Sequence, residues 1–515
     1  MSRLRSSRPA GSRLAAALAA LLLAGAAGCG GGGEPEPAPA PAGPPACTGD
    51  ADCEPPLSCA TGGVHETELE PGELGRCLPD GQIVGRGPPT WPWQPGGRPL
   101  AERLCVVQGL DWGASAEAGA RRAVQRQLLE QAGVAVIRLD LPWAQIEPKP
   151  GAFDFSAADP MVDAALASGL SVLGILAYGV PWASTEPGAD DKYPPDDPAD
   201  YAAYARKVAE HFAGRIRDYE LWNEPNVGWR FFKPQLNGDA ARYGKLLVAA
   251  SASVREACAD CRLYSAGLSF HEQVVGGALE FTHDLLAAHP GALASVDAFG
   301  LHPYTRYPPQ AGPEQDGEGE RALGAMVADV REVLALHGAS AGLPLAATEL
   351  GWPVYEAVGE PEQAALLARE VLLGASLGLG PLCWYNLVDG EAHGSFPPES
   401  DFGLYRYGSD DPAGAASPKP ARDAFAWLAA LGDGAKPAGP SADAALHDPG
   451  AGRFALDFDG PQGRWTALWR TAGQAEVTLR GETRAAHDLS GKVVATASGG
   501  ALHVPVGPAP IYLVP

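Results

Sequence analysis

Two glutamates follow short apolar runs of the sequence and are placed to act together. Glu224 closes the segment Tyr-Glu-Leu-Trp-Asn-Glu, and Glu349 closes Ala-Ala-Thr-Glu. Glutamate is costly to bury, so two carboxyl groups directed into one cleft need a chemical reason. Cleavage of a glycosidic bond needs such a pair, because one carboxyl group protonates the leaving oxygen while the other, ionised, attacks the anomeric carbon. A retaining enzyme holds the two groups about 5–5.5 Å apart.

The segments around these glutamates alternate between strands and helices. From residue 104 onward, short apolar runs typical of buried parallel strands alternate with amphipathic segments. The predicted strands are 104–109, 135–140, 171–177, 218–222, 262–266, 297–301, 345–348 and 382–385. The predicted helices are 117–132, 159–169, 199–214, 238–258, 276–289, 321–338, 360–378 and 418–431. This alternation predicts an α/β fold, a (β/α)8 TIM barrel. An open doubly wound sheet is the alternative, but residues 109–113 (Gly-Leu-Asp-Trp-Gly) are not its usual phosphate loop.

In a TIM barrel the loops that follow the strands form the active site, which puts both glutamates on the catalytic face. Three of these loops are long and rich in aromatic residues: 178–198, 303–320 and 386–417. They favour a cleft for an extended ligand. Asp111 and Trp112 follow the first strand, where they could line that cleft.

The two glutamate motifs resemble those of the retaining (β/α)8 glycoside hydrolases, clan A. Asn223-Glu224-Pro225 ends the fourth strand, and Thr-Glu-Leu-Gly-Trp (348–352) ends the seventh. Within this clan, EQAGVAVIRLDLPWAQIEPKPGAFDF (130–155) is most similar to glycoside hydrolase family 39 and its bacterial exopolysaccharide-cleaving relatives. The resemblance covers about residues 104–432 and a C-terminal β domain. It implies hydrolysis of an oligo- or polysaccharide.

The resemblance also implies a role for each residue near the two glutamates. Glu224 would be the acid/base and Glu349 the nucleophile. Asn223 would bind the 2-hydroxyl of the sugar at the cleavage point. Arg138, at the end of the second strand, would orient Glu349 and keep it ionised.

Further side chains are expected to contact the carboxylates or the sugar. His302 and Tyr304 follow the sixth strand, and the phenol would donate to the nucleophile. Trp384 on the eighth strand would be the floor on which the sugar stacks. Four other aromatic residues are predicted stacking surfaces, with core packing as the alternative: Trp143, Tyr178, Trp182 and Trp352. Three acids are interpreted as structural or surface residues: Glu147, Asp154 and Glu220.

The overall charge argues against a nucleic-acid partner. The chain has 38 Lys and Arg against 62 Asp and Glu, a net charge of −24, which repels phosphate backbones. No metal or cofactor is expected either. His271-Glu272 lacks the second histidine of a zinc-protease helix because Val275 stands in its place, and neither a phosphate loop nor a Gly-x-Ser-x-Gly motif occurs. The oligomeric state stays open.

The N-terminus reads as an export signal. Residues 1–28 combine four arginines with an apolar run that is short for a membrane span. The run Ala26-Ala27-Gly28-Cys29 resembles the lipobox of bacterial lipoproteins, which implies a lipid on Cys29; simple cleavage that leaves Cys29 free is the alternative. Residues 29–46 form a Gly/Pro tether. We therefore expect an exported bacterial lipoprotein, anchored in a membrane by its lipid, that faces the periplasm or the cell surface.

The remaining eight cysteines are consistent with export. Four of them lie in a segment with almost no apolar core, where disulfides are favoured over a zinc site: Cys47, Cys53, Cys59 and Cys77. Their pairing stays open. Cys258 and Cys261 are predicted to form a local structural disulfide, with a redox or zinc role as the alternative. Cys105 and Cys383 lie in strand-like runs and are expected in the core, paired or free.

The chain is thus predicted to have six parts: a signal peptide (1–28), the lipidated Cys and tether (29–46), a Cys-rich module (47–80), a linker (81–103), the barrel (104–435) and a small C-terminal β-sandwich domain (436–515). The expected function is retaining, endo-acting hydrolysis of a β-linked polysaccharide. An exo-acting β-glycosidase, such as a β-xylosidase, is one alternative. A non-catalytic, glycan-binding surface lipoprotein is the other.

Overall fold

A computed structural model describes residues 91–515 except 236–237, 271–276, 305–311, 316–320, 392–398, 409–414 and 444, with backbone only at 415–416. Before residue 91 it describes the backbone of three short strands. These are β1 (Ala46–Cys47), β2 (Leu57–Ala60) and β3 (Gly75–Pro79), in an antiparallel sheet of order β1-β3-β2. The side chains of the four cysteines predicted to pair here, and Cys29 with its signal segment, lie outside the described residues.

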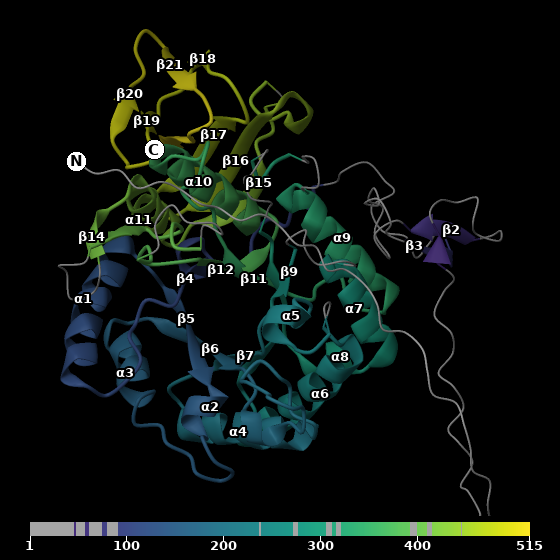
Figure 1. The fold of residues 1–515 in the computed structure, drawn as a ribbon. Coiled ribbons are helices and arrows are strands. Elements are labelled where there is room, and N and C mark those ends of the chain that lie inside the picture. The colour runs from purple at the N-terminus through teal and green to yellow at the C-terminus, as the bar shows by residue number, and fades with distance from the viewer. Residues whose placement is uncertain are drawn as a thin grey trace, which may run out of the picture. The chain divides into compact units, whose positions relative to one another are not determined.

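Eight parallel strand positions close into a barrel, as predicted (Figure 1). The sheet order is β8-β7-β6-β5-β4-β12-β11-β10-β9. The fifth position is shared by β8 and β9, and a bridge between Tyr264 and Ala298 links β8 toward β10. The strands are β4 (Leu104–Val107), β5 (Val136–Pro142), β6 (Ser171–Ala177), β7 (Asp218–Leu221), β8 (Arg262–Ser265), β9 (Leu268–Ser269), β10 (Phe299–His302), β11 (Leu345–Leu350) and β12 (Leu379–Trp384).

Helices surround the strands, and each of the eight predicted helices is present within three residues at either end (Figure 1). They are α1 (Ala116–Ala132), α3 (Asp159–Ala167), α4 (Pro198–His211), α6 (Ala240–Ala257), α7 (Gly277–Ala288), α9 (Leu323–Leu336), α10 (Glu360–Ser376) and α11 (Pro420–Gly432). Single turns form α2 (Trp143–Ile146), α5 (Gly228–Phe231) and α8 (Ala292–Ser295), with 3-10 turns at Ala101–Arg103, Pro181–Ala183 and Pro449–Ala451.

Side-chain caps fix where several helices begin. The Ser115 hydroxyl accepts from the backbone N–H of Ala118 at the start of α1, and the Asp239 carboxylate accepts from that of Arg242 at the start of α6. Gly133 then ends α1 in the left-handed conformation, with φ 72°. These caps set where each loop on the catalytic face returns to a helix.

Two disulfides lie in the barrel. Cys105 on β4 bonds Cys383 on β12, its register partner in the neighbouring strand. This bond joins the first barrel strand to the last, across 278 residues of sequence. Cys258 bonds Cys261 within the short connection from α6 to β8.

The C-terminal part is all β and packs on the barrel. Phe454 and Trp469 belong to the same buried cluster as the barrel residues, and the Trp469 indole N–H donates to Glu314 Oε1 across 2.7 Å. Six strands form one sheet: β15 (Lys436–Pro440), β16 (Arg453–Gly460), β17 (Gly463–Arg470), β22 (Ile511–Val514), β19 (Ala485–His487) and β20 (Val493–Ala495). Two further two-stranded antiparallel sheets are β18 (Ala475–Arg480) with β21 (Ala501–Val506) in the C-terminal part, and β13 (Tyr405–Tyr407) with β14 (Ala415–Pro418) after the last barrel strand. Among the described residues, no helix combines the length and apolar character needed to cross a bilayer.

Candidate active site

The backbone is strained where β7 ends. Trp222 and Glu224 adopt φ of 81° and 42°, a region that residues with a side chain rarely enter. Two hydrogen bonds hold this turn: the Trp222 indole donates to the Phe231 carbonyl (2.9 Å), and the Glu224 N–H donates to the Gly267 carbonyl (3.1 Å). Such conformations persist where the surroundings enforce them, often at functional sites.

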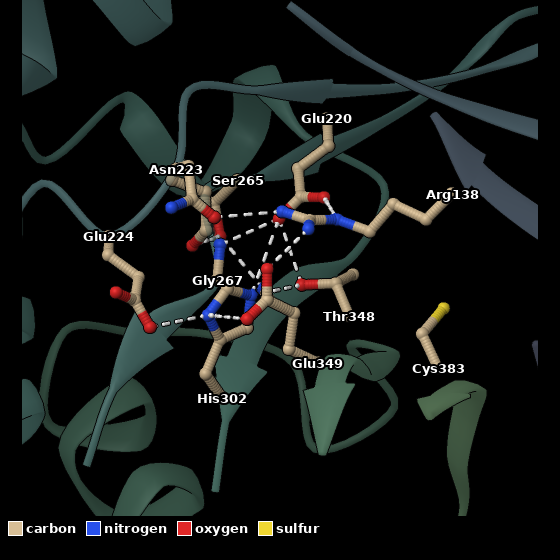
Figure 2. A network of polar contacts seen from close by, with 12 residues as sticks. Arg138, Glu220, Asn223, Glu224, Ser265, Gly267, His302, Thr348, Glu349 and Cys383 are labelled. Atoms are coloured by element: carbon tan, nitrogen blue, oxygen red, sulfur yellow. Dashed lines mark hydrogen bonds and ion pairs between the residues drawn. The ribbon is translucent and has the colours of Figure 1, made fainter. Parts of the chain in front are cut away.

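Arg138 is the hub of the polar network below this turn (Figure 2). Its guanidinium donates to Glu220 Oε2 (2.5 Å), Glu349 Oε1 (2.6 Å) and Asn223 Oδ1 (2.9 Å). Burial alone would lower the pKa of Arg138, but the charges of Glu220 and Glu349 outweigh it and raise that pKa. Arg138 is therefore a permanent cation that joins strands β5, β7 and β11.

Glu220 is the residue of this network that sequence reasoning missed. It was interpreted as structural, yet its fully buried carboxylate accepts from Arg138, from the Gly267 N–H (2.9 Å) and from the Thr348 hydroxyl (2.9 Å). Its place within a predicted barrel strand, where a glutamate is costly to bury, was the available signal. Its position beneath Arg138 sets the direction of the whole guanidinium.

His302 stands between the two candidate catalytic carboxylates (Figure 2). Its Nδ1 lies 2.8 Å from Glu224 Oε1 and 3.7 Å from Glu349 Oε2, and its Nε2 lies 3.0 Å from Thr348 Oγ1. The ring is completely buried. Burial opposes protonation, but the charge of Glu349 and the hydrogen bond and charge of Glu224 outweigh it, so the pKa of His302 is raised.

Glu349 is held on both oxygens. Arg138 binds Oε1, and the Tyr304 hydroxyl donates to Oε2 across 3.1 Å. One oxygen of Glu349 and one of Glu224 lie within 4.8 Å of each other. That separation is close to the range of retaining glycosidases and short of the roughly 6.5–9.5 Å of inverting ones.

The predicted sugar floor is wrong. Trp384 is completely buried, and its indole donates to the Phe402 carbonyl (2.9 Å), so no ring face is available to a ligand. The next residue, Tyr385, is only partly buried and feels the charge of Glu349. Tyr385, the residue directly after β12, is therefore the aromatic side chain that borders the site.

Two other predicted stacking surfaces are also wrong, because their rings are buried in the core. Trp143 stacks on Tyr204 at 5.2 Å and donates to Glu147, and the Trp352 indole donates to Glu370. Both prove to be packing residues.

Tyr178 and Trp182 keep partly exposed rings. Lys192 Nζ lies 3.3 Å over the centre of the Tyr178 ring, and Phe231 stacks on it at 5.6 Å. The Trp182 indole donates to the Glu147 carbonyl while its ring meets Trp143 edge-on. Burial, and then the charges of Asp140, Glu349 and Glu224, raise the pKa of Tyr178, in line with a position near the two candidate catalytic carboxylates.

Glu224, His302 and Glu349 could also supply ligand atoms to a metal ion, since one such atom of each lies within 4.8 Å of the others. The contacts around them suit proton transfer better. The Arg138 guanidinium already neutralises Glu349 at 2.6 Å and would repel a second cation. His302 Nδ1 is hydrogen-bonded to Glu224.

Comparisons with known proteins find solved structures of similar fold but no matching family model or curated sequence. No family model matches the sequence, and no curated protein does. The fold is similar to a family 39 glycoside hydrolase from Bacteroides cellulosilyticus WH2, with a TM-score of 0.60, 23% identity and 81% of each chain covered.

Two further solved structures are similar over 81–82% of this chain and 97% of their own. One is a monomeric β-xylosidase from Caulobacter crescentus CB15, with a TM-score of 0.55 and 16% identity. The other is a family 30 endoxylanase from Clostridium papyrosolvens C71, with a TM-score of 0.50 and 12% identity. The chain therefore has the clan A (β/α)8 fold that family 39 glycoside hydrolases share.

Proposed function

We propose that this protein is a retaining glycoside hydrolase that cleaves β-linked polysaccharide, with Glu224 as acid/base and Glu349 as nucleophile. The observation that carries the proposal is the pair itself. Two carboxylates lie within 4.8 Å, one bound to a permanent cation and the other to a histidine. Different partners separate the protonation states of two similar groups, which double displacement requires.

Glu349 attacks the anomeric carbon in the first step. The contacts with Arg138 and Tyr304 keep it ionised and fix its direction. The Arg138 guanidinium also holds Asn223 Oδ1, so the Asn223 amide N–H groups are left to donate to the sugar 2-hydroxyl, a bond that strengthens in the transition state.

Glu224 must hold a proton when the leaving oxygen departs, and the network around His302 provides it. Glu220, paired with Arg138, is an acceptor only, so the Thr348 hydroxyl donates to it. Thr348 can then only accept from His302 Nε2, which must carry a proton. One further proton is shared between His302 Nδ1 and Glu224 Oε1. When this proton is on Glu224, the carboxyl group can act as the general acid. In the second step the Glu224 carboxylate takes a proton from the attacking water.

A link across the mouth of the barrel favours a second candidate, an exo-acting β-glycosidase such as a β-xylosidase. Arg230, after β7, forms a two-pronged ion pair with Glu399, after β12, at 2.7 and 3.1 Å. Strands β7 and β12 are four positions apart in the sheet, on opposite sides of the barrel. A bridge between their loops would limit how long a substrate can lie across the mouth of the barrel, which suits short substrates.

Two measurements test the proposal. Wild-type protein and Glu349→Gln are incubated with β-linked polysaccharides, and reducing ends, product lengths and the initial product anomer are followed. We expect release by wild type with retained configuration, and a loss of about 10⁴-fold or more in the variant, as for removal of a catalytic nucleophile. Internal products support endo action, and single sugars support exo action. Binding without release by both proteins would instead favour a non-catalytic glycan-binding protein.

Azide rescue separates the two carboxylates. With an activated aryl glycoside, Glu224→Ala should be accelerated by azide and give a product of retained configuration, because azide attacks the glycosyl-enzyme. Glu349→Ala should give the inverted azide, because azide then takes the place of the nucleophile. Exchanged outcomes would reverse the two assignments.

A further inference from the structure

A cavity of about 430 Å³ opens at the carboxyl ends of β4, β5 and β12. Its volume lies in the usual range for small-molecule sites. Asp140, which lines it, lies two residues from Arg138, whose guanidinium binds Glu349, so the cavity lies near the candidate catalytic pair.

Two acceptors in this cavity have no hydrogen-bond partner within the part of the chain that the structure describes. Asp140 follows Arg138 by two residues on β5, so it lies on the same face of the strand, and its carboxylate makes no hydrogen bond or ion pair among the described residues. Asn386 also lines the cavity, and its Oδ1 is buried without a hydrogen-bond partner among the described residues. The Asp140 carboxylate is partly exposed, whereas Asn386 Oδ1 is a buried acceptor without a partner, which is unfavourable and rare in proteins. A bound ligand that donates hydrogen bonds would satisfy both.

Asp111, on the same cavity wall, shows the contrast. Its carboxylate is bound by Arg121 and accepts from Gln125 Nε2 at 2.7 Å, and its N–H donates back to Gln125. Two side chains of α1 therefore already satisfy the Asp111 carboxylate. Asp140 is the carboxylate left for a ligand.

The rest of the lining suits a sugar ring. Gln108 directly follows β4, with φ 55°, and its exposed side chain lines the cavity. Partly exposed Trp112 and the apolar side chain of Met161 form other parts of the lining. A sugar ring has a rim of hydroxyl groups and a C–H face, and this mixture of amide, carboxylate and apolar surface matches both.

The strand order shows which end of a substrate the cavity would hold. The leaving group departs beside Glu224 on β7, whereas β4 and β12 lie three and four positions away. We infer that this cavity binds a neutral sugar unit on the non-reducing side of the unit that Glu349 attacks, with Asp140 as its specificity-determining acceptor. This inference rests on the proposed hydrolase function.

The charges around the cavity favour a neutral sugar unit over an acidic one. The described residues that line the cavity include no Lys or Arg. The nearby cations have other partners: Arg138 binds Glu349, and Lys192 lies 3.3 Å from both the Tyr178 ring centre and Asp191. A uronate would place a second carboxylate beside Asp140 with no counter-ion, whereas a pair of hydroxyl groups could donate to both of its oxygens.

The test compares substrates with one and two sugars. Wild type, Asp140→Asn and the control Asp163→Asn, whose carboxylate is 63% exposed on α3, are assayed on para-nitrophenyl β-xyloside, β-xylobioside, β-glucoside and β-cellobioside. A fifth substrate is the β-cellobioside with its distal glucose oxidised to glucuronate. We expect Asp140→Asn to raise KM for the neutral disaccharides by about 10- to 100-fold, the usual effect of removing a charged hydrogen-bond partner. For the monosaccharide substrates KM should change far less than for the disaccharides, the control should match wild type on every substrate, and wild type should disfavour the glucuronate.

The failures of the two proposals are distinguishable. A protein that cleaves the monosaccharide substrates but gains nothing from the second sugar is a glycosidase without this subsite. Equal effects of Asp140→Asn on one- and two-sugar substrates would also overturn the subsite. If wild type cleaves none of the five, the proposed activity fails on these sugars. Glu349→Gln is then titrated with xylotetraose and cellotetraose by calorimetry, and absence of Asp140-dependent binding overturns the subsite too.

Discussion

His302 Nδ1 lies 2.8 Å from Glu224 Oε1, with the imidazole completely buried and its other nitrogen 3.0 Å from Thr348 Oγ1. The proton of the candidate acid therefore belongs to a pair of groups. Such a pair titrates with apparent pKa values of its own, because either site can hold the proton. Activity should be lost at the pH where the pair gives up its last proton.

Replacing His302 should move the alkaline limb of the pH profile. With one of two proton sites removed, the remaining proton leaves at lower pH, so the alkaline limb of kcat/KM in His302→Gln should shift to lower pH. The pKa of His302 is raised in wild type, so that limb should lie above the ordinary histidine value of about 6.5. His503→Gln, in the distant β21 strand, is the control. An unshifted limb in His302→Gln would mean that Glu224 titrates alone.

Replacing Glu220 should reduce turnover more than binding. Glu220 accepts from Arg138, Thr348 and Gly267, and touches no described part of the substrate site, so it acts as a positioning residue. In Glu220→Gln one oxygen becomes a donor that faces a donor. We expect kcat to fall by roughly 100-fold with KM changed far less, since a misplaced group mainly weakens the transition state. Partial recovery of kcat in Glu220→Asp would support a positioning role. A rise in KM with kcat unchanged would contradict it.

Most of the fold was predictable because its signals are local. Buried parallel strands are short apolar runs, and helices are amphipathic segments with caps such as Ser115 and Asp239. The barrel strands and helices therefore appear in the sequence almost at their true bounds. The division of the fifth strand into β8 and β9 depends on pairing with β7 on one side and β10 on the other, which no local pattern shows.

The site was predictable where a motif names the residue. Site residues were missed where their position depends on which way the side chain of a strand residue points. The segment Leu-Cys-Trp-Tyr at the end of β12 and just after it has no alternation of polar and apolar residues, so nothing in it indicates that Tyr385 borders the site while Trp384 is buried. Glu220 and Thr348 became visible only once β5, β7 and β11 were side by side. Asp140 was missed for another reason, since an unmet hydrogen bond is a property of the folded surroundings.

Glu370 should make the protein less stable as the pH rises. It is completely buried on α10, and burial raises its pKa to about 8. The unfolded chain ionises this group near its ordinary value of about 4.3, whereas the folded chain keeps it protonated to about pH 8. Between these values folding stability should fall by at most about 1.4 kcal/mol per pH unit. Glu370→Gln should flatten that slope in denaturant titrations, and the exposed-site variant Glu256→Gln should not. Equal slopes in all three proteins would contradict the shift.

The Cys105–Cys383 disulfide should stabilise the barrel far more than the Cys258–Cys261 disulfide does. A cross-link stabilises mainly by limiting the unfolded chain, and the effect grows with the length of the closed loop. The two bonds close loops of 278 and 3 residues of separation. Replacing both cysteines by alanine should lower the unfolding free energy by roughly 5 kcal/mol for the first pair and clearly less for the second. Equal losses, measured by urea unfolding, would show that local packing dominates over chain entropy.

The ion pair of Arg230 and Glu399 should control which substrates enter. Both side chains are nearly half exposed, so breaking the pair should change stability by about 1 kcal/mol or less. It joins loops from opposite sides of the barrel, and Arg230 senses the charge of Glu224. Arg230→Gln should therefore raise kcat/KM on polysaccharide relative to a small aryl glycoside. The exchange Arg230→Glu with Glu399→Arg should restore the wild-type ratio, because the charges are reversed while the bridge remains. A ratio unchanged in Arg230→Gln would show that the pair lies outside the path of the chain and would remove the observation that favours exo action.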